Sequence, residues 1–295
     1  MSIVLGVNHQ FIFTRGMTDP VIHTETLKEA AAYPEIDALD CWTWPEARRA
    51  KEESRILKDS GKWINYNIGD RPGDEPCFPG SPDPARRERA YDILMREFDH
   101  AMDCGARKII LGSGPDVPED RETAKRHFAE ILVRVGKNVP RDVTVAVEPT
   151  DRDVDKHFLL GPAKETADFL HDVQAMGLPN AGMLLDMCHI PIMHETLESA
   201  VKNAGDTIRH IHLGNCIIKD PLNPFYGDKH VAWGAEGSEY GEKETAIFAG
   251  LLKNAGYLDC EHATVTFEMR RAGNLDAKQS LQFFIDIWNR ALAAI

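Results

Sequence analysis

The chain has 295 residues, of which 43% are hydrophobic and 27% charged, enough for one large α/β barrel or two smaller domains. Its formal net charge is −13 without a block of lysine or arginine, which argues against a nucleic acid partner, because phosphate binding rests on clustered positive charge. The six scattered cysteines indicate a reducing compartment, and no run has the length of a membrane span or the pattern of a secretory signal. We therefore expect a cytoplasmic protein.

Apolar, strand-like runs alternate with amphipathic, helix-like runs along the chain. Helices are expected between the strands, the first over residues 19–33 behind an Asp-Pro cap and a short one over 195–204. Residues 69–84, dense in Gly, Pro and Asp, and residues 213–240 are expected to form long loops. The expected strands cover residues 3–7, 36–41, 62–68, 108–111, 144–148, 182–185, 208–211 and 264–267.

Eight strand–helix pairs are typical of the (β/α)8 TIM barrel, which takes roughly 250 residues. We predict an α/β protein with one TIM-barrel domain over residues 1–295. The rival is a doubly wound sheet, which needs a Gly-rich phosphate-binding turn after its first strand. The residues at that position are Asn8, His9 and Gln10, which do not form such a turn.

Four expected strands end in a side chain of the kind that binds metals, namely Glu148, Asp186, His212 and Glu268. In a TIM barrel the carboxyl ends of the strands converge on one pocket. Three carboxylates that lie close together repel one another, and a divalent cation removes that cost. An oxygen-rich set with one imidazole suits Mn²⁺, our first choice, or Mg²⁺, Co²⁺ or Zn²⁺.

These residues resemble those of the xylose-isomerase-like TIM barrels, the sugar isomerases and epimerases with which endonuclease IV is grouped. The four strand-end residues match that family's metal ligands in order and strand position. Residues 186–189 match its Asp-x-x-His motif, which implies that His189 contacts substrate and belongs to the catalytic residues together with Glu148 and Glu268. Asp228 and His230 resemble its Asp-x-His segment. The resemblance also implies a homo-oligomer that acts on a small sugar.

The chain departs from parts of the family pattern. Endonuclease IV holds three zinc ions with histidines on strands three and four, whereas these strands end here in Asn-Ile-Gly (67–69) and Gly-Ser-Gly (112–114). This argues against a trinuclear phosphodiesterase site. The epimerases often carry Asp and then Arg after the strand-seven histidine, where this chain has Asn215 and Lys219, so a different substrate preference is expected.

The predicted chemistry is proton abstraction beside a carbonyl, through an enediolate that a chelated metal stabilises. Carboxylates on both sides of the substrate carbon, Glu148 and Glu268, would act as bases and epimerise it, while a one-sided shuttle would isomerise it. We therefore predict a metal-dependent sugar isomerase or epimerase.

Two alternatives stay open. The same enolisation can expel a β-substituent, as in inosose dehydratases and the catalytic subunits of C-glycoside deglycosidases, which this chain also resembles. That lyase would act on a keto-sugar, keto-cyclitol or keto-glycoside. The apolar residues of the strand-seven loop, Pro221, Pro224, Phe225, Tyr226 and Trp233, would receive an aglycone or a small partner subunit. The other alternative is a non-catalytic sugar-binding barrel.

The remaining candidates are residues that would bind the substrate. His189 could instead cap a turn, and for Asp228 and His230 a functional role and a variable loop are equally open. His9 and Trp42 would form a sugar-facing wall or pack in the core. Lys156 and Lys219 would bind a substrate oxygen or carboxylate, or else are solvated loop residues. Arg270 and Arg271 could hold a phosphate, but no Gly-rich cradle accompanies them, so a phosphorylated substrate is not supported. The full candidate set is His189, Asn215, Lys219, Asp228, His230, His9 and Trp42.

Overall fold

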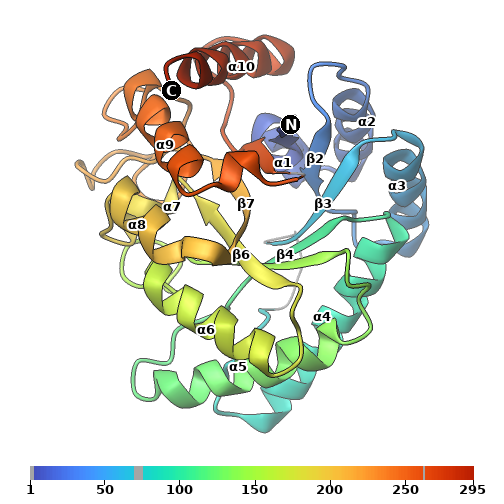
Figure 1. The fold of residues 1–295 in the computed structure, drawn as a ribbon. Helices are drawn as coiled ribbons and strands as arrows, with labels where there is room; N and C mark the ends of the chain where they lie inside the picture. Colours follow the sequence, from blue (N-terminus) through green and yellow to red (C-terminus); the bar gives the residue numbers. More distant parts are fainter. Residues whose placement is uncertain (1–2, 70–75, 262) are drawn as a thin grey trace.

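The computed structural model describes residues 3–69, 76–261 and 263–295, and its parallel strands close into an eight-stranded barrel in chain order (Figure 1). The (β/α)8 prediction is confirmed. The strands are β1 (Val4–Asn8), β2 (Ala38–Cys41), β3 (Trp63–Ile68), β4 (Lys108–Gly112), β5 (Thr144–Glu148), β6 (Ala181–Asp186), β7 (Ile208–Leu213) and β8 (Thr264–Phe267). The helices are α1 (His9–Ile12), α2 (Pro20–Ala31), α3 (Ala47–Asp59), α4 (Pro84–Asp103), α5 (Arg121–Gly136), α6 (Ala163–Ala175), α7 (His189–Ile192), α8 (Leu197–Ala204), α9 (Glu242–Asn254) and α10 (Ala277–Ala293).

The helices largely follow the sequence pattern. The side chain of Asp19 caps α2 by accepting hydrogen bonds from the backbone N–H groups of Val21 and Ile22. The helix expected over 195–204 begins at residue 197, because Thr196 and Ser199 form a capping box. The four-residue helices α1 and α7 were not predicted, since one turn is too short to show a period.

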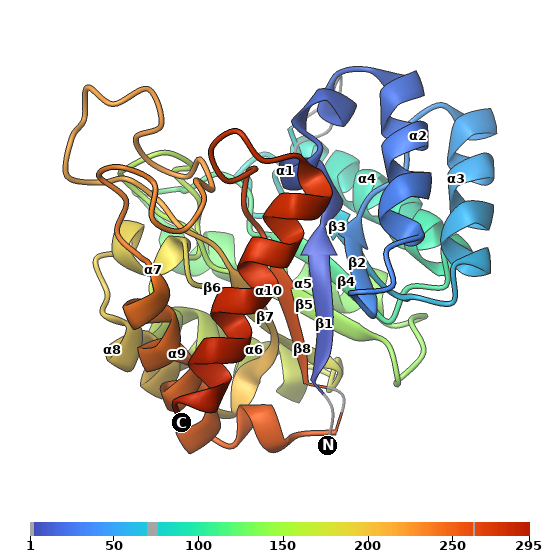
Figure 2. The same cartoon turned by 90° about the horizontal axis from the view of Figure 1, so that it is seen from above.

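Apart from their end residues, Pro84 in α4 and Leu213 in β7, the two expected loops carry no helix or named strand in the part that the structure describes. The first falls partly on residues 70–75, which lie outside the described residues. The second, between β7 and α9, extends from the end of the barrel where the strands' carboxyl ends lie (Figure 2). Among the described helices, none combines the length and apolarity that a membrane crossing requires.

Side-chain alternation divides each strand between two environments. Residues such as Leu39, Tyr66 and Val147 belong to the large buried cluster that also contains helix residues such as Phe128 and Phe248. Their neighbours along the strands point into the barrel, where Ile110, Ala146 and Leu184 form a small separate cluster. The four strand-end residues, Glu148, Asp186, His212 and Glu268, have this inward parity and lie one step above the residues that fill the barrel.

We predict that Phe128→Ala lowers the free energy of unfolding by about 3–5 kcal/mol, because it opens a cavity in the outer core. Phe128 is fully buried on α5, and its ring lies 5.1 Å from that of Phe169 on α6. Urea denaturation followed by circular dichroism measures the change. As a control, Val21→Ala at a position that is 54% exposed should change stability by less than about 0.5 kcal/mol. A loss below about 1 kcal/mol for Phe128→Ala would contradict the packing described.

Candidate active site

The four strand-end residues meet at the mouth of the barrel. Glu148, Asp186, His212 and Glu268 each offer one ligand atom, and these atoms all lie within 4.8 Å of one another. Nδ1 of His212 is 2.5 Å from Oε2 of Glu268 and 3.8 Å from Oε1 of Glu148. At Gly214, directly after β7, a Cβ atom would lie 2.5 Å from Oδ1 of Asp186, so only glycine lets the chain pass this close.

Three of the four ligand-type side chains, those of Asp186, His212 and Glu268, are held through one atom while a second atom faces the shared centre. Oδ1 of Asp186 accepts a hydrogen bond from the Cys188 N–H (2.7 Å), and Oε1 of Glu268 accepts one from Nδ2 of Asn8 (2.6 Å). Oδ2 of Asp186, Nδ1 of His212 and Oε2 of Glu268 are buried and have no hydrogen-bond partner. Because buried polar atoms normally have partners, this donor set fits a divalent cation.

The electrostatics of the cluster also fit a divalent cation. Burial raises the pKa of Asp186 to about 7, an effect that His189 opposes and the charge of Glu268 increases. Burial likewise raises the pKa of Glu148, although His189 and His212 attract its charged form. Carboxylates in this position are driven toward the protonated form, and a bound cation would keep them ionised.

His189, Asp228 and His230 form a second group beside the first. Nδ1 of His189 is 3.0 Å from the carbonyl of Pro149, and Nδ1 of His230 is 2.9 Å from the carbonyl of Glu268. The Nε2 atoms of the two histidines therefore turn to Oδ1 of Asp228, at 3.2 and 2.8 Å. Burial lowers the pKa of His230, but Asp228 and Glu268 outweigh burial and raise it to about 9. Two other sets of side chains have metal-ligand spacing, one of Asp186, Cys188, His189 and His230, the other of Asp40, His210 and His212.

A cavity of about 520 Å³ opens onto both groups and has walls of two kinds. The polar wall includes both glutamates of the cluster and the second group, together with Lys156 and Arg270. Nζ of Lys156 lies 3.6 Å from Oδ2 of Asp228, so this lysine is part of the site and not a solvated loop residue. The other wall is largely apolar and is lined by Phe11, Met17, Ile68, Ile93, Leu94, Leu111, Pro115 and Phe158.

His9 and Trp42 do not line this cavity, and their prediction as a sugar-facing wall is corrected. His9 is the first residue of α1, and its Nε2 bonds to Oγ1 of Thr26 at 2.9 Å, so the ring points toward α2. Trp42 is 1% exposed and stacks on His23 with a ring-centre distance of 4.2 Å. Its Nε1 donates to Gln10, a residue that does line the cavity.

Asn215 and Lys219 also lie away from the cavity. Asn215 is fully buried and bonds to both the N–H and the carbonyl of Tyr240, at 2.9 Å each, so it ties together the two ends of the long loop. The side chain of Lys219 is 71% exposed and pairs with Glu239. Trp233, expected on an apolar loop surface, packs instead against Phe267 and Phe284 in the core.

Several contributors to the site were not predicted from sequence. Asn8 holds Glu268, and the ring of Phe11 lies 4.1 Å from that of His230. Asp40 and His210 lie deeper in the barrel and bond to each other at 2.8 Å. A signal for His210 was present, because it stands two residues before His212 and so shares its inward face.

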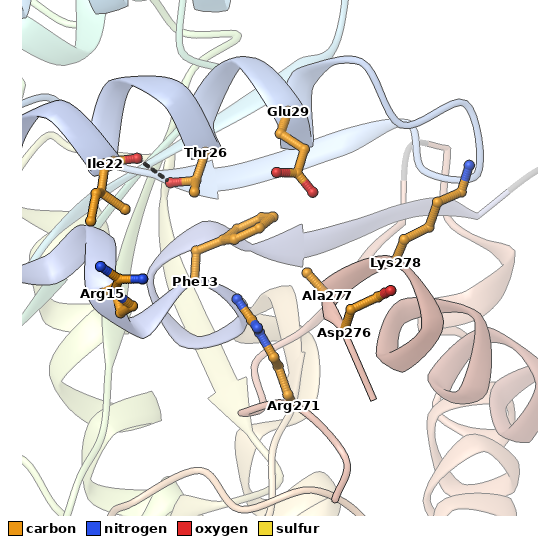
Figure 3. A pocket seen from close by; sticks show the side chains of 9 residues that line it. All are labelled: Phe13, Arg15, Ile22, Thr26, Glu29, Arg271, Asp276, Ala277 and Lys278. Carbon is orange, nitrogen blue, oxygen red and sulfur yellow. Dashed lines mark hydrogen bonds between the residues drawn. The ribbon is translucent and has the colours of Figure 1, made fainter. Parts of the chain in front are cut away.

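A second cavity of about 370 Å³ lies between α2 and the start of α10 (Figure 3). It contains no member of either group described above. Figure 3 shows Arg15, Arg271 and Glu29 around the ring of Phe13, and Asp276 and Lys278 at the start of α10. Charges of both signs line it, which gives no preference for an anion or a cation, and we assign it no role.

The comparisons with known proteins agree with the fold. An L-ribulose 3-epimerase structure matches with a TM-score of 0.71 and 18% identity, covering 99% of this chain and 96% of that one. The apo form of 3-keto-D-glucoside 4-epimerase from E. coli gives 0.69 and 14% identity over 98% and 100% of the two chains. An AP endonuclease of family 2 from Brucella melitensis gives 0.70 and 18% over 97% and 99%.

No curated protein sequence matches the chain. A family profile, described as xylose isomerase-like TIM barrel, matches residues 35–292. That range spans most of the barrel and contains Glu148, Asp186, His212 and Glu268, which together are called the acid cluster below. The chain therefore belongs to the xylose isomerase-like TIM barrel family.

Proposed function

We propose that this protein is a divalent-metal-dependent sugar isomerase or epimerase. The observation that carries the proposal is the convergence of four ligand atoms within 4.8 Å of one another, at the edge of a cavity large enough for a sugar. The structures of L-ribulose 3-epimerase and of D-psicose 3-epimerase with D-tagatose, which share the fold, support this class of reaction.

The cation would be held by Glu148, Asp186, His212 and Glu268, with manganese as the first choice. When bound, such an ion stabilises the negative charge that develops on a substrate oxygen as a proton leaves the adjacent carbon. Only Glu148 and Glu268 of the four line the cavity, so the substrate would approach the cluster from their side.

Glu148 and Glu268 are the proposed bases. They come from β5 and from the end of β8, so a substrate carbon between them would present a different face to each carboxylate. One carboxylate would take the proton and the other would return a proton to the opposite face, which inverts the centre. Asn8 holds Oε1 of Glu268, which leaves Oε2 for the shared centre.

His189 is the proposed substrate-binding residue between the two groups. Its Nδ1 is 3.4 Å from Oε1 of Glu148 and its Nε2 is 3.2 Å from Asp228, so a sugar hydroxyl beside Glu148 would come within its reach. Lys156, His230 and Arg270 complete the polar wall and would bind further oxygens.

The second candidate is a lyase on a keto-sugar or keto-glycoside, which would use the same bases to expel a β-substituent. The apolar wall of the cavity favours it, because Phe11, Leu111 and Phe158 offer a surface that a free sugar does not need. Leu222 and Phe225 on the long loop are 93% and 44% exposed and could meet an aglycone or a partner subunit.

We predict that Glu148→Gln and Glu268→Gln each lower turnover by about 10²–10⁴-fold, since each removes one proton-transfer step and keeps the shape of the side chain. The measurement incubates Mn²⁺-loaded protein in D2O with a panel of ketoses and 3-keto-glycosides, and follows exchange and products by NMR. Solvent deuterium at the inverted carbon would support epimerisation, and release of an aglycone or water would support the lyase.

Glu29→Gln is the control for these variants, because Glu29 lines the second cavity and should leave turnover unchanged. Metal content and circular dichroism of each variant separate loss of a base from loss of the ion or the fold. Full activity in metal-loaded Glu148→Gln and Glu268→Gln would remove both glutamates from the mechanism.

We predict that removing metal with a chelator abolishes turnover and that Mn²⁺ restores it. The ion should also raise stability, by about 2.7 kcal/mol at a concentration 100 times its dissociation constant, because it binds the folded state. Thermal unfolding with and without Mn²⁺ measures the second effect. Sugar binding that needs no metal, without turnover, would favour the non-catalytic sugar-binding barrel.

A further inference from the structure

A buried carboxylate beneath the acid cluster has no part in the proposed proton transfer. Asp40 lies on β2 inside the barrel and is fully buried. It accepts hydrogen bonds from four side chains that come from β3, β7 and β8. Its Oδ1 accepts from Nδ2 of Asn65 (2.8 Å) and Oγ1 of Thr266 (2.7 Å), and its Oδ2 from Nε2 of His210 and Nε2 of His212 (2.8 Å each).

These partners define where the protons are. The amide of Asn65 and the hydroxyl of Thr266 donate to Oδ1, so a proton on Asp40 has no acceptor there. Asp40 is therefore ionised, and its Oδ2 requires a hydrogen on Nε2 of both histidines. His210 is neutral in this arrangement, because the hydroxyl of Thr264, 2.6 Å from its Nδ1, can donate to that atom.

Asp40 also decides which nitrogen of His212 can face a cation. Because Nε2 donates to Asp40, the nitrogen left for an ion is Nδ1, which lies 2.5 Å from Oε2 of Glu268. Burial lowers the pKa of His212, but Glu268 and Asp40 outweigh burial and raise it, so without an ion Nδ1 also holds a proton, which a bound cation would displace. We propose that Asp40 is a positioning residue that holds His212 as the Nε2–H tautomer, with Nδ1 directed at the cation site. The inference rests on the metal site of the proposed function and not on the sugar chemistry.

An amide at position 40 holds His212 less firmly than a carboxylate. If the NH2 group of an asparagine took the place of Oδ2, it would donate to both Nε2 atoms, and an ion bound at Nδ1 of His212 would force a hydrogen onto Nε2 against it. If the NH2 group took the place of Oδ1, the Asn65 amide would have to turn over and the Thr266 hydroxyl to rotate so that both accept from it, and a neutral oxygen would replace the carboxylate at Nε2 of His212. A leucine at position 40 offers no acceptor in any orientation.

The first experiment measures Mn²⁺ binding to the metal-free protein by calorimetry, without substrate. For Asp40→Asn we expect affinity about 10- to 100-fold weaker than wild type, the range found for residues that orient a metal-binding histidine. The Co²⁺ visible spectrum should change as well, because the geometry at His212 is altered. Wild-type affinity and an unchanged Co²⁺ spectrum in both Asp40→Asn and Asp40→Leu, which has no acceptor at all, would overturn the proposal.

Glu53→Gln is the matched control. Glu53 is also fully buried and also accepts from a histidine, Nδ1 of His23 at 3.0 Å, and from Thr24 and the Trp44 N–H. It lies on α3, outside the barrel, so its replacement should cost comparable stability without changing Mn²⁺ affinity. An equal loss of affinity in both variants would reduce the effect of Asp40 to general destabilisation and would overturn the proposal.

The second experiment reads the tautomer directly and does not require that Asp40→Asn folds. NMR of wild-type protein labelled with ¹⁵N-histidine and loaded with Zn²⁺, which is diamagnetic, should show the hydrogen of His212 on Nε2 and the ion on Nδ1, assigned by loss of the signal in His212→Gln. A hydrogen on Nδ1, or a His212 signal that the ion does not shift, would overturn the proposal. Both measurements omit sugar, so a protein that binds Mn²⁺ as expected but turns over no sugar would contradict only the proposed function.

Discussion

The site depends on the cost of holding three carboxylates in one buried place. Glu148, Asp186 and Glu268 cannot stay ionised together at the bottom of a cavity unless positive charge lies among them. Parallel strands in a closed barrel bring them together because the inward positions at the strand ends face the same axis. The helices surround the barrel on its outer side (Figure 1). The cavity at the barrel mouth, which Glu148 and Glu268 line, gives a substrate access to the cluster.

Below the cluster, the inside of the barrel divides into two halves. Ile110, Ala146 and Leu184 from β4, β5 and β6 form an apolar plug. The half contributed by β2, β3, β7 and β8 is a polar network around Asp40. A TIM barrel is usually filled by branched apolar side chains, and a buried polar network is favourable only when every member is satisfied. Burying the polar half therefore costs free energy that a filling of apolar side chains would avoid.

The division has a consequence for the residues above it. His212 stands over the polar half and is held from below through Nε2, while Glu148 stands over the apolar plug and has no such anchor. The side chain of Glu148 is also the most exposed of the four, at 14% against 4% or less for the others. A fixed imidazole suits a ligand, and a less constrained carboxylate beside the cavity suits a base that must reach a substrate carbon.

The geometry of the barrel explains which site residues could be predicted from the sequence and which could not. The four strand-end residues could be found because the convergence of strand ends does not depend on the details of any loop. Asp40 could not be matched with His212 from sequence, because the hydrogen bond between these side chains of β2 and β7 crosses the inside of the barrel and exists only once the barrel has closed. His9 was misplaced because its neighbour Asn8 is the inward residue of β1, which turns His9 toward α2.

The long loop after β7 shows how far the polar wall is part of the fold. His230 adopts a left-handed backbone with φ of 49°, which for a residue other than glycine costs about 1–3 kcal/mol. Its ring bonds to the Glu268 carbonyl, and its own carbonyl accepts from the Arg270 N–H at 2.8 Å, so the segment after β8 holds it in place.

Farther out, the Lys229 ammonium and the Asp228 N–H both bond to Asp155. The base of the loop is thereby built into the site, whereas its tip carries the exposed Leu222. In the proposed function, a sugar would meet the fixed base of the loop, and any substituent that it carries would meet the apolar wall of the cavity.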